Sequence, residues 1–120
     1  MPKFVLTFQY SSGSWARMLR VADDRRAAVT ALIEHLHGKV EAMYWGVDTA
    51  RAIVIAELPD SLSATAAIAA ATETAAFKDV QVHEVLTQDQ LREVVALAKS
   101  SEGLYRPPGL AAIESDLATE

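Results

Sequence analysis

The sequence predicts an α+β fold of the ferredoxin-like kind, a βαββαβ antiparallel sheet followed by a C-terminal helix. Segments rich in β-branched and aromatic residues alternate with segments of helical periodicity, and their order is β-α-β-β-α-β. The two middle strands are separated by a turn short enough for a hairpin. Right-handed crossovers then place both long helices on the same face of the sheet.

The first half of this pattern begins with a strand at residues 3–10, KFVLTFQY, and a polar turn, SSGS. A short helical piece at residues 15–20 precedes a longer helix that Asp23 or Asp24 caps. That helix carries an apolar stripe at helical spacing, namely Val29, Leu32, Ile33 and Leu36. Gly38 follows, where we expect the left-handed conformation that ends many helices.

The second half begins with the strand pair at residues 39–46 and 51–58, which Pro59 ends. Asp60 or Ser61 caps an alanine-rich helix that reaches about residue 76. The last strand is predicted at residues 80–86. The sequence TQDQ after it is a capping box, with Thr87 as the N-cap and Gln90 three residues on, and it opens a final helix.

We expect one domain at residues 1–99 and a tail at residues 100–120 that is either disordered or packed on a neighbouring subunit. The chain has no cysteine, which excludes a disulfide scaffold and a cysteine nucleophile and fits the cytoplasm. A net charge of −5 provides no basic field for nucleic acid. We expect no secretory signal, membrane span or cofactor, because no segment or motif for them occurs.

Strand alternation gives the predicted sheet two different faces. One face is almost wholly apolar and is assigned to the helices: Phe4, Leu6, Phe8, Tyr10, Val40, Ala42, Tyr44, Ala52, Val54, Ala56, Leu58, Val80, Val82 and Leu86. The other is mixed: Val5, Thr7, Gln9, Glu41, Met43, Trp45, Ile53, Ile55, Glu57, Gln81, His83 and Val85. A mixed face suits the sheet of a second copy with a cleft left between, so we expect a homodimer or a higher oligomer.

Two sets of residues on the mixed face are candidates for a site. The first could line a small-molecule pocket: Gln9, Glu41, Met43, Trp45 and Ile55. For Glu41, Met43 and Trp45, packing between subunits is the favoured interpretation. The second is the pair His83 and Glu57, which could transfer a proton across a partly desolvated cleft. Gln9 or Thr7 of the strand between them would lie in the gap. A solvated histidine and a strand-end glutamate are favoured over that catalytic pair.

Two further clusters favour structural interpretations. Glu34, His35 and His37 stand one or two residues apart, which points them to different sides of a helix, so no metal site is predicted. The basic cluster of Arg17, Arg20, Arg25 and Arg26 is interrupted by two aspartates and is interpreted as a solvated face. An anion site near the helix start is compatible with it but is not required.

Four segments resemble the GYD domain family over residues 1–98: MPKFVL, HGKVEAMYW, IVIAELPD and DVQVHEVLTQDQ. The resemblance implies a ferredoxin-like fold of the dimeric α/β-barrel type and no established reaction. The Gly-x-Tyr-Asp stretch that names the family is not kept, because Asp48, Ala50 and Arg51 occupy its positions. The resemblance therefore adds little about chemistry.

Three classes of function stay open. The favoured one is a small protein that binds a small molecule on the helix-free face of a homodimer. The second is a cofactor-free oxygenase, isomerase or decarboxylase that uses His83 or Glu57, for which the sequence holds no recognisable catalytic motif. The third is a regulatory or structural homo-oligomer without a small-molecule site.

Overall fold

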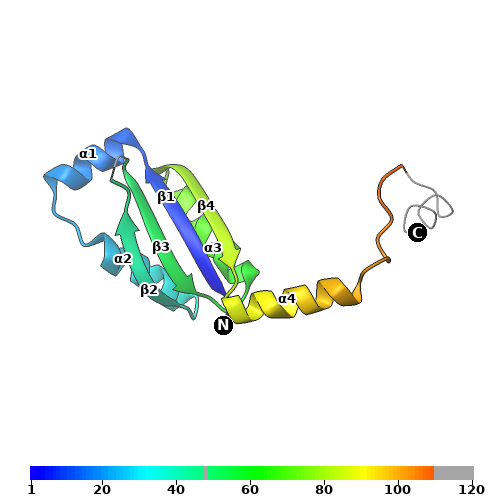
Figure 1. Ribbon diagram of the computed structural model, residues 1–120. Helices are drawn as coiled ribbons and strands as arrows, with labels where there is room; N and C mark the ends of the chain where they lie inside the picture. The colour runs from blue at the N-terminus through cyan, green and yellow to red at the C-terminus, as the bar shows by residue number, and fades with distance from the viewer. Residues whose placement is uncertain (48, 110–120) are drawn as a thin grey trace. The chain divides into compact units, whose positions relative to one another are not determined.

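A computed structural model describes residues 1–47 and 49–109 (Figure 1). The elements are β1 (Lys3–Tyr10), α1 (Ser12–Arg20), α2 (Arg25–His35), β2 (Lys39–Trp45), β3 (Arg51–Glu57), α3 (Ser61–Glu73), β4 (Phe77–Val85) and α4 (Gln88–Ser100). The chain divides into two compact units, Met1–Val85 and the part that begins at Leu86. The first unit holds the sheet and three helices, and the second holds α4.

The four strands form an antiparallel sheet in the order β2-β3-β1-β4, so the α+β, ferredoxin-like fold is confirmed. Helices α2 and α3 lie on the same side of this sheet, as the right-handed crossovers predict (Figure 1). Helix α2 packs mainly beside β2, and α3 packs beside β4.

The core lies between the sheet and these two helices. Strands β1 and β3 bury every second side chain, and the helices add Ile33 and three alanines. Its members are Phe4, Leu6, Phe8, Tyr10, Ile33, Ala52, Val54, Ala56, Leu58, Ala64, Ala67 and Ala71. The alanines of α3 bring its backbone close to the large side chains of β1, so the helix-facing assignment of β1 and β3 is confirmed.

Helix α1 starts earlier than the sequence predicts. Ser11 is its N-cap and accepts a hydrogen bond from the Ser14 backbone N–H, so residues predicted as a turn form the first turn of a helix. The Ser11 N–H also donates to the Ala76 carbonyl, which ties the end of β1 to the start of β4. Ser14 is consequently buried, which a polar turn residue would not be.

The turn after α2 corrects the role predicted for Gly38. His37, with φ of 64°, is the left-handed residue. The His37 N–H donates to Glu34 and the Gly38 N–H donates to Ile33, the two bonds of a Schellman motif. Gly38 is required for space, because a Cβ there would lie 2.4 Å from the Glu57 carbonyl oxygen. The N-caps of α2 and α3 are Asp24 and Asp60, each one of the two residues predicted.

A bulge in β2 changes which side chains face the helices. Lys39 and Val40 pair with Glu57 and Ala56, but the next pair is Ala42 with Ile55, which leaves Glu41 as the extra residue. Every residue of β2 beyond Glu41 therefore points to the face opposite to the one that strict alternation predicts.

The second unit contains α4, and its capping box is confirmed, with Thr87 and Gln90 exchanging both hydrogen bonds. Its apolar residues Leu91, Val94 and Val95, which stand at helical spacing, are each partly exposed. The expected tail overlaps the end of α4, continues as turns and leaves residues 110–120 outside the described part. Within the described ranges, no helix is long and apolar enough to cross a membrane.

Candidate functional site

The bulge divides the predicted ligand-binding set between the two faces of the sheet. Met43 and Trp45 pair with Val54 and Ala52, whose side chains are buried under the helices, so their placement on the helix-free face is wrong. Met43 packs against the core, and the Trp45 ring lies 5.8 Å from the Tyr10 ring and 6.1 Å from the Trp15 ring. Ala42 and Tyr44 take their places on the other face.

The helix-free face, called the open face below, is ordered by the strand register. Its two middle rows run across β4, β1, β3 and β2 as His83, Val5, Ile55 and Ala42, and as Gln81, Thr7, Ile53 and Tyr44. The apolar residues of β1 and β3 are half-buried, and Tyr44 is 59% exposed. This is a continuous apolar band with a polar edge on β4.

The other two predicted ligand residues of β1 and β2 are held at opposite ends of the open face. Glu41 forms an ion pair with Lys3, with 3.0 Å between Oε2 and Nζ. At the far end, Arg51 donates from Nη2 to Oε1 of Gln9 at 2.7 Å. Ile55 lies between them in the apolar band, so the structure does not gather the predicted set around one place.

His83 and Glu57 share the open face, as predicted, but do not meet. Val5 is opposite His83 and Lys3 is opposite Glu57, so these two residues separate them instead of Gln9 or Thr7. His83 and Glu57 are two strands apart across the sheet and two residues apart along it, which corresponds to roughly 12 Å between their Cα atoms. His83 Nε2 lies 3.4 Å from Gln81 Oε1 on its own strand. Direct proton transfer between the pair is therefore out of reach, and a ligand would have to bridge Lys3 and Val5.

No three His, Cys, Asp or Glu side chains come close enough to hold a metal ion within residues 1–47 and 49–109. Of the EHLH cluster, Glu34 and His35 end α2 and His37 occupies the left-handed position after it. The Schellman turn therefore explains why His37 lies where it does.

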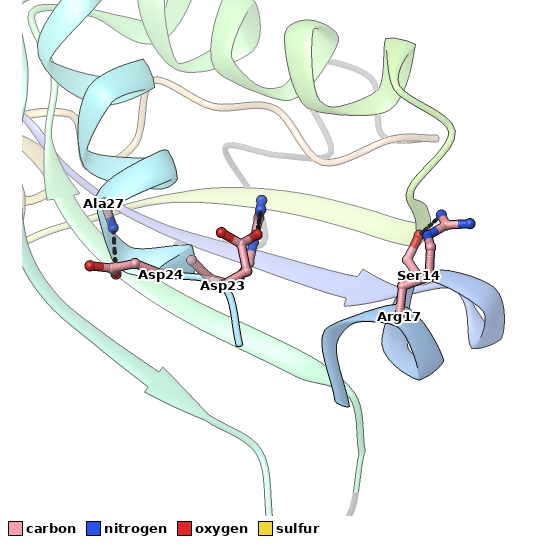
Figure 2. Close-up of polar contacts among 6 residues, drawn as sticks. Ser14, Arg17, Asp23, Asp24 and Ala27 are labelled. Carbon is pink, nitrogen blue, oxygen red and sulfur yellow. Dashed lines mark hydrogen bonds and ion pairs between the residues drawn. The ribbon is translucent and has the colours of Figure 1, made fainter. Parts of the chain in front are cut away.

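A cavity of about 430 Å³ lies on the other side of the sheet and is called the polar cavity after the two arginines and one aspartate in its otherwise largely apolar lining. Its lining comes from the end of β1, from α1 and from the approach to α2: Tyr10, Ser14, Arg17, Met18, Val21, Ala22, Asp23, Arg25 and Ala76. Figure 2 shows Ser14 and Arg17 on one side of this region and Asp23 and Asp24 on the other. Arg17 Nη2 donates to Ser14 Oγ at 3.2 Å, which fixes the hydroxyl beside the cavity.

Among the charged groups that line this cavity, Arg25 has contacts with both a carboxylate and an aromatic ring. Its Nη1 donates to Asp23 Oδ2 at 2.6 Å, and its guanidinium carbon lies 5.9 Å from the centroid of the Tyr10 ring. The Asp23 carboxylate raises the pKa of Arg25, while partial burial acts in the opposite direction. The Nε atom is buried and has no hydrogen-bond partner among the described residues. A buried N–H without an acceptor is costly, which marks this edge of Arg25 as unusual.

A second cavity, of about 340 Å³ and called the apolar cavity, lies between α2 and α3. Small residues of α3 and the apolar stripe of α2 line it: Phe8, Arg25, Ala28, Val29, Leu32, Ile33, Ala70, Ala71, Thr74, Ala76 and Phe77. It shares Arg25 and Ala76 with the polar cavity. Both volumes fall in the range of about 300–1,000 Å³ that is typical of ligand pockets.

Sequence reasoning missed both cavities, although two signals point to them. The sequence predicts a solvated face for the arginines between residues 17 and 26, but Arg25 is half-buried over an aromatic ring. The alanine-rich α3 gives little side-chain volume opposite α2, and this leaves space between the helices.

Comparison with known families gives one finding that fits this fold. The model of the GYD domain matches residues 4–95, which include three strands, all of β1 except Lys3, and most of α4. The sequence matches no curated protein. Asp48, one of the positions of the naming motif, lies outside the described residues. Because the match spans well over half of the chain, this protein belongs to the GYD domain family.

Proposed function

We propose that the chain works as a homodimer whose two open faces meet and hold a small molecule between them. The observation that carries this proposal is the apolar band of the open face, with Val5, Ile53 and Ile55 at its centre. Helices α2 and α3 cover the opposite side (Figure 1). Antiparallel sheets can leave one face in water, but such a face is normally polar. A band of this kind favours a second apolar surface as its cover.

The charges at the ends of the open face are compatible with self-association. One end carries Lys3, Lys39, Glu41 and Glu57, and the other carries Arg51 and Asp79. Each end holds both signs, so a two-fold axis brings opposite charges within reach in either orientation.

The area of the face sets the expected strength of this dimer. Seven residues along four strands project to roughly 450 Å² per subunit, or about 900 Å² for the pair. Stable interfaces usually exceed about 1,000 Å². We therefore expect a reversible dimer that dissociates on dilution.

A small molecule suits the β4 side of the same face. There the polar side chains of Thr7, Gln81 and His83 border the apolar band, and a pocket commonly combines apolar walls with a few polar groups. Of the residues predicted from sequence, Ile55 remains in this place, whereas Met43 and Trp45 belong to the helix-facing side. A cofactor-free enzyme that uses His83 or Glu57 gains no specific support, because the two residues flank Lys3 and Val5.

Sedimentation velocity over a range of concentrations tests the dimer. The full chain should shift from monomer to dimer, and Ile55→Lys should remain monomeric because a charge would enter the apolar band. The control is Leu62→Lys, which places the same charge on α3 at a side chain 79% exposed and should leave dimerisation unchanged. A neutral dye such as Nile red should bind the wild-type dimer, and Ile55→Lys should lose the part of the dye signal that rises with dimer formation. Equal dimerisation of both variants would refute the proposal.

A further inference from the structure

Arg25 lines both the polar and the apolar cavity, on the helix side of the sheet. Asp23 occupies its Nη1, and Tyr10 lies beneath its guanidinium group. The edge of a guanidinium that carries Nε and Nη2 presents two parallel N–H groups, which is the geometry that a carboxylate accepts. At Arg25 this edge includes the Nε that has no acceptor among the described residues.

We propose that the two cavities together form a binding site for a medium-chain carboxylate, with the carboxylate on Arg25 and Arg17 and the apolar chain between α2 and α3. This site goes beyond the proposed function, because it lies on the opposite side of the sheet from the open face. Ligand binding involves a small rotation of the Arg25 side chain that turns Nε toward the polar cavity while Asp23 keeps Nη1.

The charge balance of the polar cavity selects a monoanion. Arg17 and Arg25 contribute two positive charges and Asp23 removes one, so the cavity has a net charge of about +1 before a ligand enters. A carboxylate brings this cavity to a net charge of about zero, whereas a phosphate dianion would leave it at about −1. The buried hydroxyl of Ser14 adds a polar group on the same wall.

The apolar cavity selects the rest of the ligand. Apart from Arg25 and Thr74, its lining residues carry only hydrocarbon side chains. A methylene chain placed there leaves water, which stabilises the complex by about 0.8 kcal/mol per buried CH₂. A short acid such as acetate would reach only the arginines of the polar cavity, so it would gain no free energy from burial of a methylene chain.

Isothermal titration of the full chain with octanoate tests the proposal, with octanol and acetate as comparison ligands. Octanoate should bind measurably, and octanol and acetate should each bind at least about tenfold more weakly, a difference of about 1.4 kcal/mol. Arg25→Gln should weaken octanoate binding by about tenfold or more because it removes the guanidinium. Ala70→Leu should also weaken it, because the added side chain fills the apolar cavity.

The control variants distinguish the loss of a ligand contact from the loss of the folded structure. Arg20→Gln removes an exposed arginine of α1 that lines neither cavity and should bind octanoate like the wild type. Arg17→Gln removes the second proposed contact to the carboxylate and should also weaken octanoate binding. Because Arg17 is exposed, this variant should fold normally even if Arg25→Gln does not. Ile55→Lys should retain octanoate binding even as a monomer, which distinguishes this site from the open face. No octanoate binding, octanol binding as strong as octanoate, or equal binding by the Arg17, Arg20 and Arg25 variants would overturn the proposal.

Discussion

Trp45 stacks on Tyr10, with ring centroids 5.8 Å apart and ring planes 24° apart. Tyr10 ends β1 and Trp45 ends β2, two strands that β3 separates in the sheet. The bulge at Glu41 turns the Trp45 side chain toward the helices. Trp15 of α1 and Phe77 of β4 extend this contact into an aromatic cluster. The cluster lies at the same end of the first unit as the polar cavity, since Tyr10 belongs to both.

We predict that Trp45→Ala lowers the free energy of unfolding by about 1–2 kcal/mol, because aromatic stacking is lost at a side chain that is only partly buried. Tyr44→Ala is the matched control, since its neighbour Tyr44 points to the open face. Its effect should be under about 0.5 kcal/mol in dilute, monomeric protein. Urea unfolding followed by circular dichroism measures both. A larger loss for Tyr44→Ala would mean that the bulge does not reverse the faces of β2.

In the turn after α2, we predict changes in stability of opposite sign for substitutions at two adjacent residues. Gly38→Ala should destabilise the fold by about 1–3 kcal/mol, because the new methyl group would meet backbone and side-chain atoms of β3, Leu58 and α2. His37→Gly should stabilise it by about 0.5 kcal/mol, because glycine relieves the left-handed backbone.

Thermal unfolding of these two variants provides the measurement. If the roles predicted from sequence were right, Gly38 would carry the left-handed conformation and His37→Gly would bring no gain. A stabilised Gly38→Ala would contradict the close approach to Glu57.

We predict that the N-cap of α3, Asp60, contributes stability that is lost in acid. Its carboxylate accepts a hydrogen bond from the Ser63 N–H at 2.8 Å, and this bond lowers the pKa of Asp60 below its ordinary value of 3.8. A lowered pKa means that the unfolded chain binds the proton more readily than the folded one. The contribution is therefore complete above the ordinary pKa and disappears as the pH falls through the folded one.

Thermal unfolding between mildly acidic and strongly acidic pH measures this contribution. Asp60→Asn keeps a capping side chain without a titrating charge, so the difference between wild type and variant should shrink as the pH falls. A difference that is independent of pH would show that the charge of Asp60 contributes nothing to the cap.

The sequence was sufficient to predict the features that repeat along the chain. Alternation placed Phe4, Leu6 and Phe8 of β1 against the helices, and the capping box at Thr87 located the start of α4. These signals work because several residues share one period or one hydrogen-bond pattern.

The features that sequence analysis missed depend on single residues or on empty space. One extra residue at Glu41 reverses Met43 and Trp45, yet nothing in the local pattern distinguishes a bulge from continuous alternation. The cavities depend on the spacing of α2 and α3 over the sheet, which only the assembled fold reveals. For the same reason the paired roles of Arg25, Asp23 and Tyr10 could not be predicted from the arginine cluster alone.

The meeting of two open faces is tested most directly by spin-label distances between subunits. The chain has no cysteine, so Thr7→Cys labels the open face and Ala31→Cys labels the outside of α2 uniquely. Facing sheets lie about 10 Å apart, and the helix layers add roughly 20 Å between the outer labels. We predict a clearly shorter intersubunit distance for Thr7→Cys than for Ala31→Cys in the concentrated protein. The reverse order, or no intersubunit distance at either position, would contradict it.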